Sequence, residues 1–257
     1  MPDYARMEGI SMNDAGQQER VSYTKNDGGI AHITLERDRA LNAIDAQMMR
    51  DLWAALDRFH IDEPARVAII SGSGRAFCVG ADIKSRKPPE DLDPTEDLAH
   101  LSTAFLSRDR FKPIIASVHG HVVGAGLRMS LLSDFVICGE SALFRAPEVQ
   151  HGLNAGFFWS ILQARAGDSF ATDVVATGRT WTAQEAVDRG LVTKCVADNE
   201  LRSETLGYAE LIADQPPVAM EAVINTRRAS LRRLDLQSWE SRGRNLGWRS
   251  STSGSSS

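Results

Sequence analysis

Two short segments of the chain carry backbone groups that could act on a carbonyl compound. The first, GRAFCVGADIK at 74–84, follows a short apolar run, and its small residues Gly80 and Ala81 let a ligand approach the backbone. The second, GAG at 124–126, opens a segment typical of a helix, whose first amides have no acceptor inside the helix and carry the positive end of its dipole. One amide from each segment could hold a carbonyl oxygen as it gains charge, which is an oxyanion hole. The simpler alternative is that these glycines only permit tight packing of helix on strand.

Arg128 stands on the first turn of that helix among apolar residues, where an arginine is costly to bury without a partner. Other candidates for chemistry are weaker. His119 and His121 have no third ligand near them in the sequence, so we predict no metal site. Cys78 lies inside the first segment, but nothing near it marks a nucleophile, and packing is the better interpretation. Asp134 ends the helix and is expected to bond the local backbone.

The bulk composition excludes several classes of protein. The 257 residues allow one large domain or two small ones, with 42% hydrophobic and 25% charged residues. The net charge of −5 argues against a general nucleic-acid binder, because the phosphate backbone favours a basic face. No apolar run is long enough for a transmembrane helix, and residues 1–20 lack the apolar core of a signal peptide. Three widely spaced cysteines, at 78, 138 and 195, are typical of free thiols in a reducing compartment, so we expect a cytoplasmic protein.

The elements that would position the two segments alternate between strand and helix. A hairpin signal at 26–29 joins two strand-like runs, and residues 45–62 have apolar positions at helical spacing. Short continuous apolar runs predict buried strands at 67–72, 114–123 and 135–140. This alternation predicts βα units around a parallel core sheet.

The chain after residue 167 is expected to be mostly helical. Thr182 and Glu185 together predict a capping box at the start of one helix, and Gly190 could end it.

Several segments, in the same order, resemble the crotonase superfamily, the enoyl-CoA hydratase/isomerase family. They are RALNAID at 39–45, GRAFCVGADIK at 74–84, the run from KPIIASVHGHVVGAG to APEVQHGL at 112–153, and ATGRTWTAQEAVDRGLVTKCV at 176–196. The likeness implies an α/β fold with a crotonase-like ββα spiral core and a C-terminal helical region, in homotrimers or dimers of trimers. It implies an acyl-CoA thioester as substrate, and no cofactor beyond the CoA moiety of that substrate. On this basis we expect a mobile tail at 1–20, the spiral core at 21–190, the helical region at 191–249 and a disordered tail at 250–257.

The likeness also implies roles for single residues. Ala81, in the family's Gly-Ala-Asp motif, and Ala125, in the middle of its glycine-rich stretch, would donate the two amides of the oxyanion hole. The expected substrate pocket contains Gly80, Gly124, Gly156 and Phe157. The expected CoA side contains Arg39, Ala40, Leu41, Asp82, Ile83 and Lys84. The phosphates of CoA suit the two cations of that set, although simple solvated surface is the alternative for each.

Glu148, in a Pro-Glu pair, matches an acid–base glutamate of the family, and its alternative is a structural carboxylate at a turn. Two-glutamate hydratases of the family carry their other glutamate at the position of Arg128, so water addition by two carboxylates is in question here. One glutamate suffices for Δ3,Δ2-enoyl-CoA isomerisation, which we favour over hydration. The alternatives are a hydratase with a non-standard site and a non-catalytic acyl-CoA-binding protein. Arg128 could pair with Glu148, bind a carboxylate of the substrate, or point away.

Overall fold

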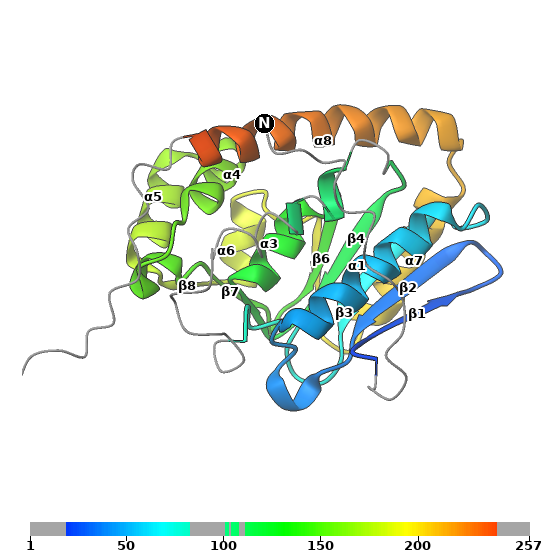
Figure 1. Cartoon of the computed structure of the whole chain (residues 1–257), viewed down its shortest axis with the longest axis horizontal. Helices are drawn as coiled ribbons and strands as arrows, with labels where there is room; N and C mark the ends of the chain where they lie inside the picture. Colours follow the sequence, from blue (N-terminus) through cyan, green and yellow to red (C-terminus); the bar gives the residue numbers. More distant parts are fainter. Residues whose placement is uncertain (1–18, 83–100, 103, 108–110, 241–257) are drawn as a thin grey trace, which may run out of the picture.

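The main sheet of the molecule has six strands, and the computed structural model describes residues 19–82, 101–102, 104–107 and 111–240 (Figure 1). The first two strands form an antiparallel hairpin and all later neighbours are parallel, as the sequence predicted. In spatial order the strands are β1 (Val21–Lys25), β2 (Ile30–Leu35), β3 (Val67–Gly72), β4 (Ile114–Val118), β6 (Phe135–Gly139) and β9 (Lys194–Val196). The edge strand β9 lies after residue 190, in the segment whose other described elements are helices.

The central strands are apolar on both faces because helices cover both. Ile69, Ile115 and Ile137 pack in a smaller cluster under α7 (Leu201–Ala213). Their neighbours Ile70 and Ala116 point the other way into the main core, on the side of α1 (Ala46–Ile61) and α3 (Ala125–Leu132). Continuous apolar runs are what two buried faces require, so the prediction of buried strands at 67–72 and 135–140 is confirmed.

The predicted strand at 114–123 is wrong as a single element. The chain leaves the main sheet after β4, and residues 121–123 enter a second sheet of order β5 (His121–Val123), β7 (Leu143–Arg145) and β8 (Thr180–Thr182). Gly120 makes the break: its φ is +54°, and a Cβ there would collide with the backbone of Arg75. Hydrophobicity continues through this bend, so an apolar run could not show it.

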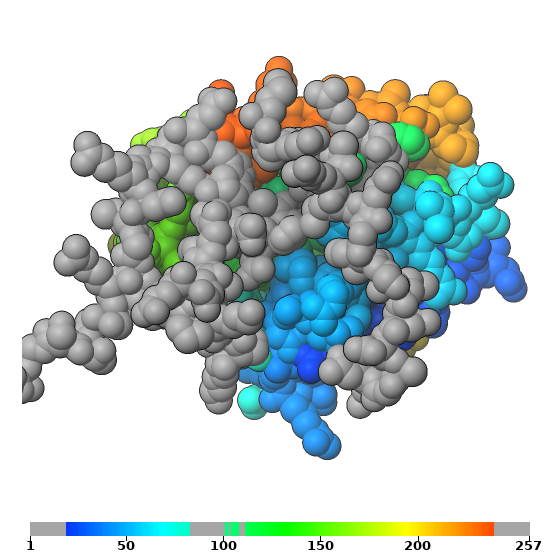
Figure 2. Space-filling view, viewed as in Figure 1, coloured from blue at the N-terminus to red at the C-terminus, as the bar shows by residue number. Residues whose placement is uncertain are grey.

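Two helices start at side-chain caps that the local sequence provides. Asp45 caps α1 (Ala46–Ile61) by accepting from the amide of Met48, and Thr182 with Glu185 forms the predicted capping box of α6 (Ala183–Asp188). Other helical elements among the described residues are η1 (Asp38–Ala40), α3 (Ala125–Leu132), η3 (Glu148–His151), α4 (Gly156–Ala166), α5 (Asp168–Thr177) and α8 (Pro217–Glu240). Figure 1 shows α8 running along one side of the molecule, past α3, with α4 and α5 at the end of the molecule far from β1. Both α1 and α8 reach the surface on the face seen in Figure 2.

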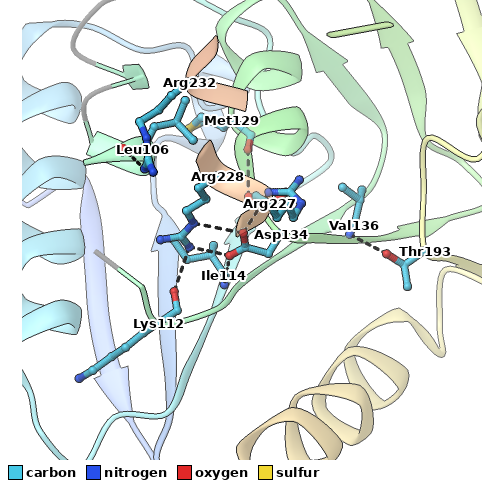
Figure 3. A network of polar contacts seen from close by, with 11 residues as sticks. Leu106, Lys112, Ile114, Met129, Asp134, Val136, Thr193, Arg227, Arg228 and Arg232 are labelled. Atoms are coloured by element: carbon cyan, nitrogen blue, oxygen red, sulfur yellow. Dashed lines mark hydrogen bonds and ion pairs between the residues drawn. The ribbon is translucent and has the colours of Figure 1, made fainter. Parts of the chain in front are cut away.

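Asp134 holds α8 to the core through a buried charge network. Its carboxylate accepts hydrogen bonds from the amide of Ile114 at 2.9 Å, from Nη2 of Arg228 at 2.5 Å and from Nη1 of Arg227 at 3.0 Å (Figure 3). Arg228 is 1% exposed and also donates to the carbonyl of Lys112. We expected Asp134 to bond the local backbone; its carboxylate instead bonds residues that lie 20, 93 and 94 positions away.

None of the helices in the described part of the chain is both long and apolar enough to cross a membrane.

Candidate active site

The segment that carries Ala81 is an extended strip beside residues 41–44. The amide of Ile44 donates to the carbonyl of Gly80 at 2.8 Å, and the amide of Asp82 donates to the carbonyl of Ile44 at 2.7 Å. Consecutive amides of an extended strip point to opposite sides, so the amide of Ala81 points away from Ile44. Gly80 has φ of +97°, and a Cβ on it would lie 3.6 Å from the amide nitrogen of Ala125. The two predicted amide donors therefore come from segments that touch.

The second donor segment is the N-terminus of α3, which the backbone fixes from both directions. The amide of Gly124 donates to the carbonyl of Arg145 at 3.0 Å, and the first helical bond runs from the amide of Arg128 to the carbonyl of Gly124 at 2.8 Å. The amides of residues 125–127 thus have no acceptor inside the helix. Gly126 must be a glycine, because a Cβ there would collide with Cys78, whereas position 125 carries an alanine in the helix. Tight packing therefore explains the glycine at 126, and the amide of Ala125 is one of those with no acceptor inside the helix.

Glu148 lies beside this helix start. It is the first residue of η3 and is 7% exposed. A Cβ on Gly124 would lie 3.0 Å from its Oε1, and the same Cβ would lie 3.7 Å from Cα of Gly80. A carboxylate, the two amide segments and the positive end of the α3 dipole are thus gathered in one place, where the dipole stabilises negative charge.

Arg128 is turned toward α8. Its Nη2 donates to Oδ1 of Asp235 at 2.8 Å and to the hydroxyl of Ser102 at 2.5 Å, and its guanidinium carbon lies 3.4 Å from the ring centre of Phe157. The side chain of Arg128 is 2% exposed, and that of Asp235 is 12% exposed. The buried cation therefore has a carboxylate and an aromatic face as partners. These contacts offset the desolvation free energy of the guanidinium.

The two other pocket residues lie at the start of α4. Phe157 is buried under the guanidinium of Arg128 and meets Phe158 edge-on at 5.5 Å between ring centres. The amide of Gly156 donates to the side chain of Asn154, and a Cβ on this glycine would lie 3.7 Å from the carbonyl oxygen of Ser238 in α8. Phe157 thus lies against the guanidinium of Arg128, and Gly156 lies against α8.

The expected CoA side is only partly described. Arg39 is exposed, and Ala40 and Leu41 are half-buried, with Leu41 in the left-handed region at φ of 52°. The carbonyl of Leu41 accepts from the amide of Val79, which keeps this turn beside the Gly80–Asp82 strip. The carboxylate of Asp82 is already paired, with Nη1 of Arg37 at 2.7 Å. Ile83 and Lys84 lie outside the described residues.

Three residues that support the site were not predicted. Arg37 holds Asp82; Asn42, fully buried at φ of 56°, accepts from the amide of Arg37 and donates to the carbonyls of Ser73 and Ala76. Asp235 holds Arg128. Asn42 carried a usable signal, because asparagine is the common non-glycine residue in the left-handed region. Asp235 carried none, since its partner lies 107 residues away.

Cys78 is a packing residue. It is fully buried under Gly126, and burial raises the pKa of its thiol to about 12, with a smaller opposing effect from the amide of Gly80. A thiol with so high a pKa is protonated at neutral pH and is a poor nucleophile.

The fold and this site together define a class of arrangement: a spiral of strands and helices in which two segments with backbone amides lie beside one buried carboxylate. Comparison with known proteins gives the family. Residues 25–251 match the sequence model of the enoyl-CoA hydratase/isomerase family, so the chain belongs to that family and has the crotonase fold. A probable enoyl-CoA hydratase of Rhizobium meliloti (strain 1021) is 37% identical over 212 residues, which cover 81% of this chain and 80% of the relative.

Two further relatives span a similar share of the chain. A carnitinyl-CoA dehydratase of Proteus mirabilis (strain HI4320) is 34% identical over 79% of this chain and 78% of its own length. The crystal structure of a probable enoyl-CoA hydratase from Mycobacterium smegmatis is 30% identical, covers 86% of this chain and 88% of its own, and superposes with a TM-score of 0.73.

Proposed function

We propose that the protein binds an acyl-CoA thioester, stabilises its enolate with the amides of Ala81 and Ala125, and moves a proton with Glu148. The observation that carries this proposal is the close approach of Gly80 and Oε1 of Glu148 to Gly124 at the start of α3. Membership of the enoyl-CoA hydratase/isomerase family supports the substrate class.

The proposed chemistry is a proton transfer between two carbons. The thioester oxygen accepts hydrogen bonds from both amides, which stabilises the negative charge that forms when the carbon next to the carbonyl, or one conjugated to it, loses a proton. Glu148 takes that proton and returns it at the other end of the allylic system, so the double bond moves and the carboxylate is restored. One carboxylate completes the cycle, and no water is consumed.

The contacts of Arg128 favour this one-carboxylate reaction. Its guanidinium is bonded to Asp235 and stacked on Phe157, so it neither supplies a carboxylate nor stands as an uncommitted cation for a substrate carboxylate. The second candidate is hydration of an enoyl-CoA or its reverse, because the relatives cited above are named as hydratases and a dehydratase. In that case another group would have to hold the water.

A paired assay separates the two candidates. The purified protein receives a 2-enoyl-CoA and a 3-enoyl-CoA of the same chain length, beside Glu148→Gln and the matched surface change Glu210→Gln on the exposed side of α7. We expect conversion of the 3-enoyl substrate and a loss of about 10²–10⁴ in turnover for Glu148→Gln alone. Hydration of the 2-enoyl substrate would instead establish the second candidate. CoA binding without turnover of either substrate would overturn both and leave a binding protein.

Arg39 is proposed to face the CoA phosphates, since it is exposed in the turn whose Leu41 carbonyl accepts from the amide of Val79, just before the strip that carries Ala81. Arg39→Ala should raise KM with little change in kcat, because a phosphate contact acts equally on ground state and transition state.

A further inference from the structure

Cys138 and Cys195 stand directly opposite each other on neighbouring strands. Cys138 lies in β6 and Cys195 in β9, and they are register partners in this parallel pair. Their side chains share one face of the sheet, because Cys138 belongs to the main core cluster and Cys195 packs against that cluster. The two thiols are also within hydrogen-bonding reach of each other. Neighbouring strands are about 4.8 Å apart, which falls inside the Cα–Cα range that a disulfide can span.

The two thiols differ in access. Cys138 is fully buried, and burial, then the neighbouring Cys195, raise the pKa of its thiol well above the usual range. Cys195 is half-buried on the edge strand and lines a hollow of about 350 Å³ together with Glu140, Ala183, Gln184 and Val187. A small molecule can therefore reach the thiol of Cys195, whereas the thiol of Cys138 lies in the core beside it.

We propose that Cys195 is a modification site for low-molecular-weight disulfides such as glutathione disulfide, and that Cys138 resolves the adduct to an internal disulfide. In the first step the Cys195 thiolate attacks a sulfur of the small disulfide and releases one small thiol, leaving a mixed disulfide. In the second step Cys138, held directly opposite the adduct, attacks the Cys195 sulfur and passes its proton to the second small thiol as that thiol leaves. Because burial keeps Cys138 protonated at rest, this is the slow step. The protein loses two electrons and two protons, which reduce the small disulfide to two thiols.

The bond would be easily reversed. A link between directly paired parallel strands must draw the two side chains together against the sheet geometry, and strained disulfides are more readily reduced. It would close a loop from 138 to 195 that contains η3, α4, α5 and α6, and so includes Glu148. The proposal does not depend on the reaction that the site catalyses.

Mass spectrometry of the wild-type protein tests the proposal. The folded protein is incubated with glutathione disulfide at mildly alkaline pH, quenched in acid, digested without reduction and mapped. We expect a loss of two hydrogens per chain, a cross-linked peptide pair containing Cys138 and Cys195, and its disappearance after treatment with dithiothreitol. A stable glutathione adduct on Cys195 without the cross-link, or no reaction at Cys195 at all, would overturn it.

Single-cysteine variants test the order of the steps. Cys138→Ser should stop at the glutathione adduct on Cys195, and Cys195→Ser should not react. Cys78→Ser, which removes the third thiol, should still form the cross-link. A cross-link involving Cys78 in the wild-type map would contradict the assignment even where a variant fails to fold.

Discussion

The two ends of α3 are built in opposite ways. At its N-terminus the amides of residues 125–127 have no acceptor in the helix, and a buried carboxylate, Glu148, lies beside them. At its C-terminus the groups that follow the helix are bonded: the amide and hydroxyl of Ser133 donate to the carbonyl of Met129, and the carboxylate of Asp134 accepts from two arginines and a backbone amide. An end with unbonded amides costs stability unless a ligand fills it, so the helix is held from the other end and from α8.

Helix α8 contacts α3 at two points with opposite charge order. Asp235 meets Arg128 on α3, and Arg228 meets Asp134 just after it. The residue numbers fall on α8 as they rise on α3, so the two helices run antiparallel, and positions 228 and 235 share one face of α8 because they are two turns apart. Shifting α8 so that the two arginines or the two aspartates approached each other would place like charges together. The two ion pairs therefore fix which way α8 lies over the candidate site.

The largest expected effect on stability comes from the network at the C-terminal end of α3. Asp134→Asn removes the carboxylate that two arginines share, one of them almost wholly buried, and should lower the free energy of unfolding by about 3–5 kcal/mol. Urea unfolding of the variant measures this. Asp173→Asn is the matched control, because the ion pair of Asp173 with Arg179 is exposed and should contribute under about 1 kcal/mol. Equal losses of unfolding free energy in the two variants would show that the Asp134 network stabilises the protein no more than an exposed ion pair does.

A change at the N-terminus of α3 should lower the catalytic rate and leave the stability nearly unchanged. Ala125→Pro removes one amide hydrogen at the first position of a helix, where proline is tolerated. We expect kcat to fall by about 10²–10³ while the unfolding midpoint changes little, as for loss of one oxyanion-hole donor. Turnover of the enoyl-CoA substrate and urea unfolding are measured on the same preparation. Unchanged turnover would mean that this amide does not contact the thioester oxygen.

Breaking the Arg128–Asp235 pair should lower the free energy of unfolding by less than Asp134→Asn and by more than Ala125→Pro. Asp235→Asn leaves the buried guanidinium with Ser102 and Phe157 but without its ion-pair partner, at an expected cost of about 1–3 kcal/mol of unfolding free energy. Adding Arg128→Met should recover most of the loss, since an apolar side chain of similar length needs no counter-charge. A double-mutant cycle measures the coupling. Additive losses would show that the two residues do not depend on each other.

The sequence indicated what is local and missed what joins distant segments. The helix at 45–62, the capping box and the buried strands at 67–72 and 135–140 follow from periodicity and single side chains, and the structure confirms them. The same holds for the glycine-rich start of α3. The bend at Gly120 was missed because glycine's freedom of φ leaves no mark on an apolar run.

The partners of the buried charges could not be predicted in the same way. Arg128 was recognised as needing a partner, but Asp235 is one of many acidic residues, and only the docking of α8 selects it. Asp134 looked like a local capping group for the same reason. Ion pairs across the fold follow from tertiary packing, which the spacing of charges along the chain does not encode.

The smallest expected effect concerns Cys78, which packs under the N-terminus of α3. With a pKa of about 12, Cys78 is protonated over the whole neutral range, and its thiolate appears only as the pH rises toward that value. At about pH 9 the thiolate fraction is about a thousandth, so iodoacetamide should leave Cys78 unmodified in the folded protein while the half-buried Cys195 reacts. Peptide mapping after short labelling measures both, and labelling in urea, where all three thiols should react, is the control. Rapid labelling of Cys78 in the folded protein would show that the N-terminus of α3 opens, and that its contact with Cys78 is looser than the contacts holding the other end.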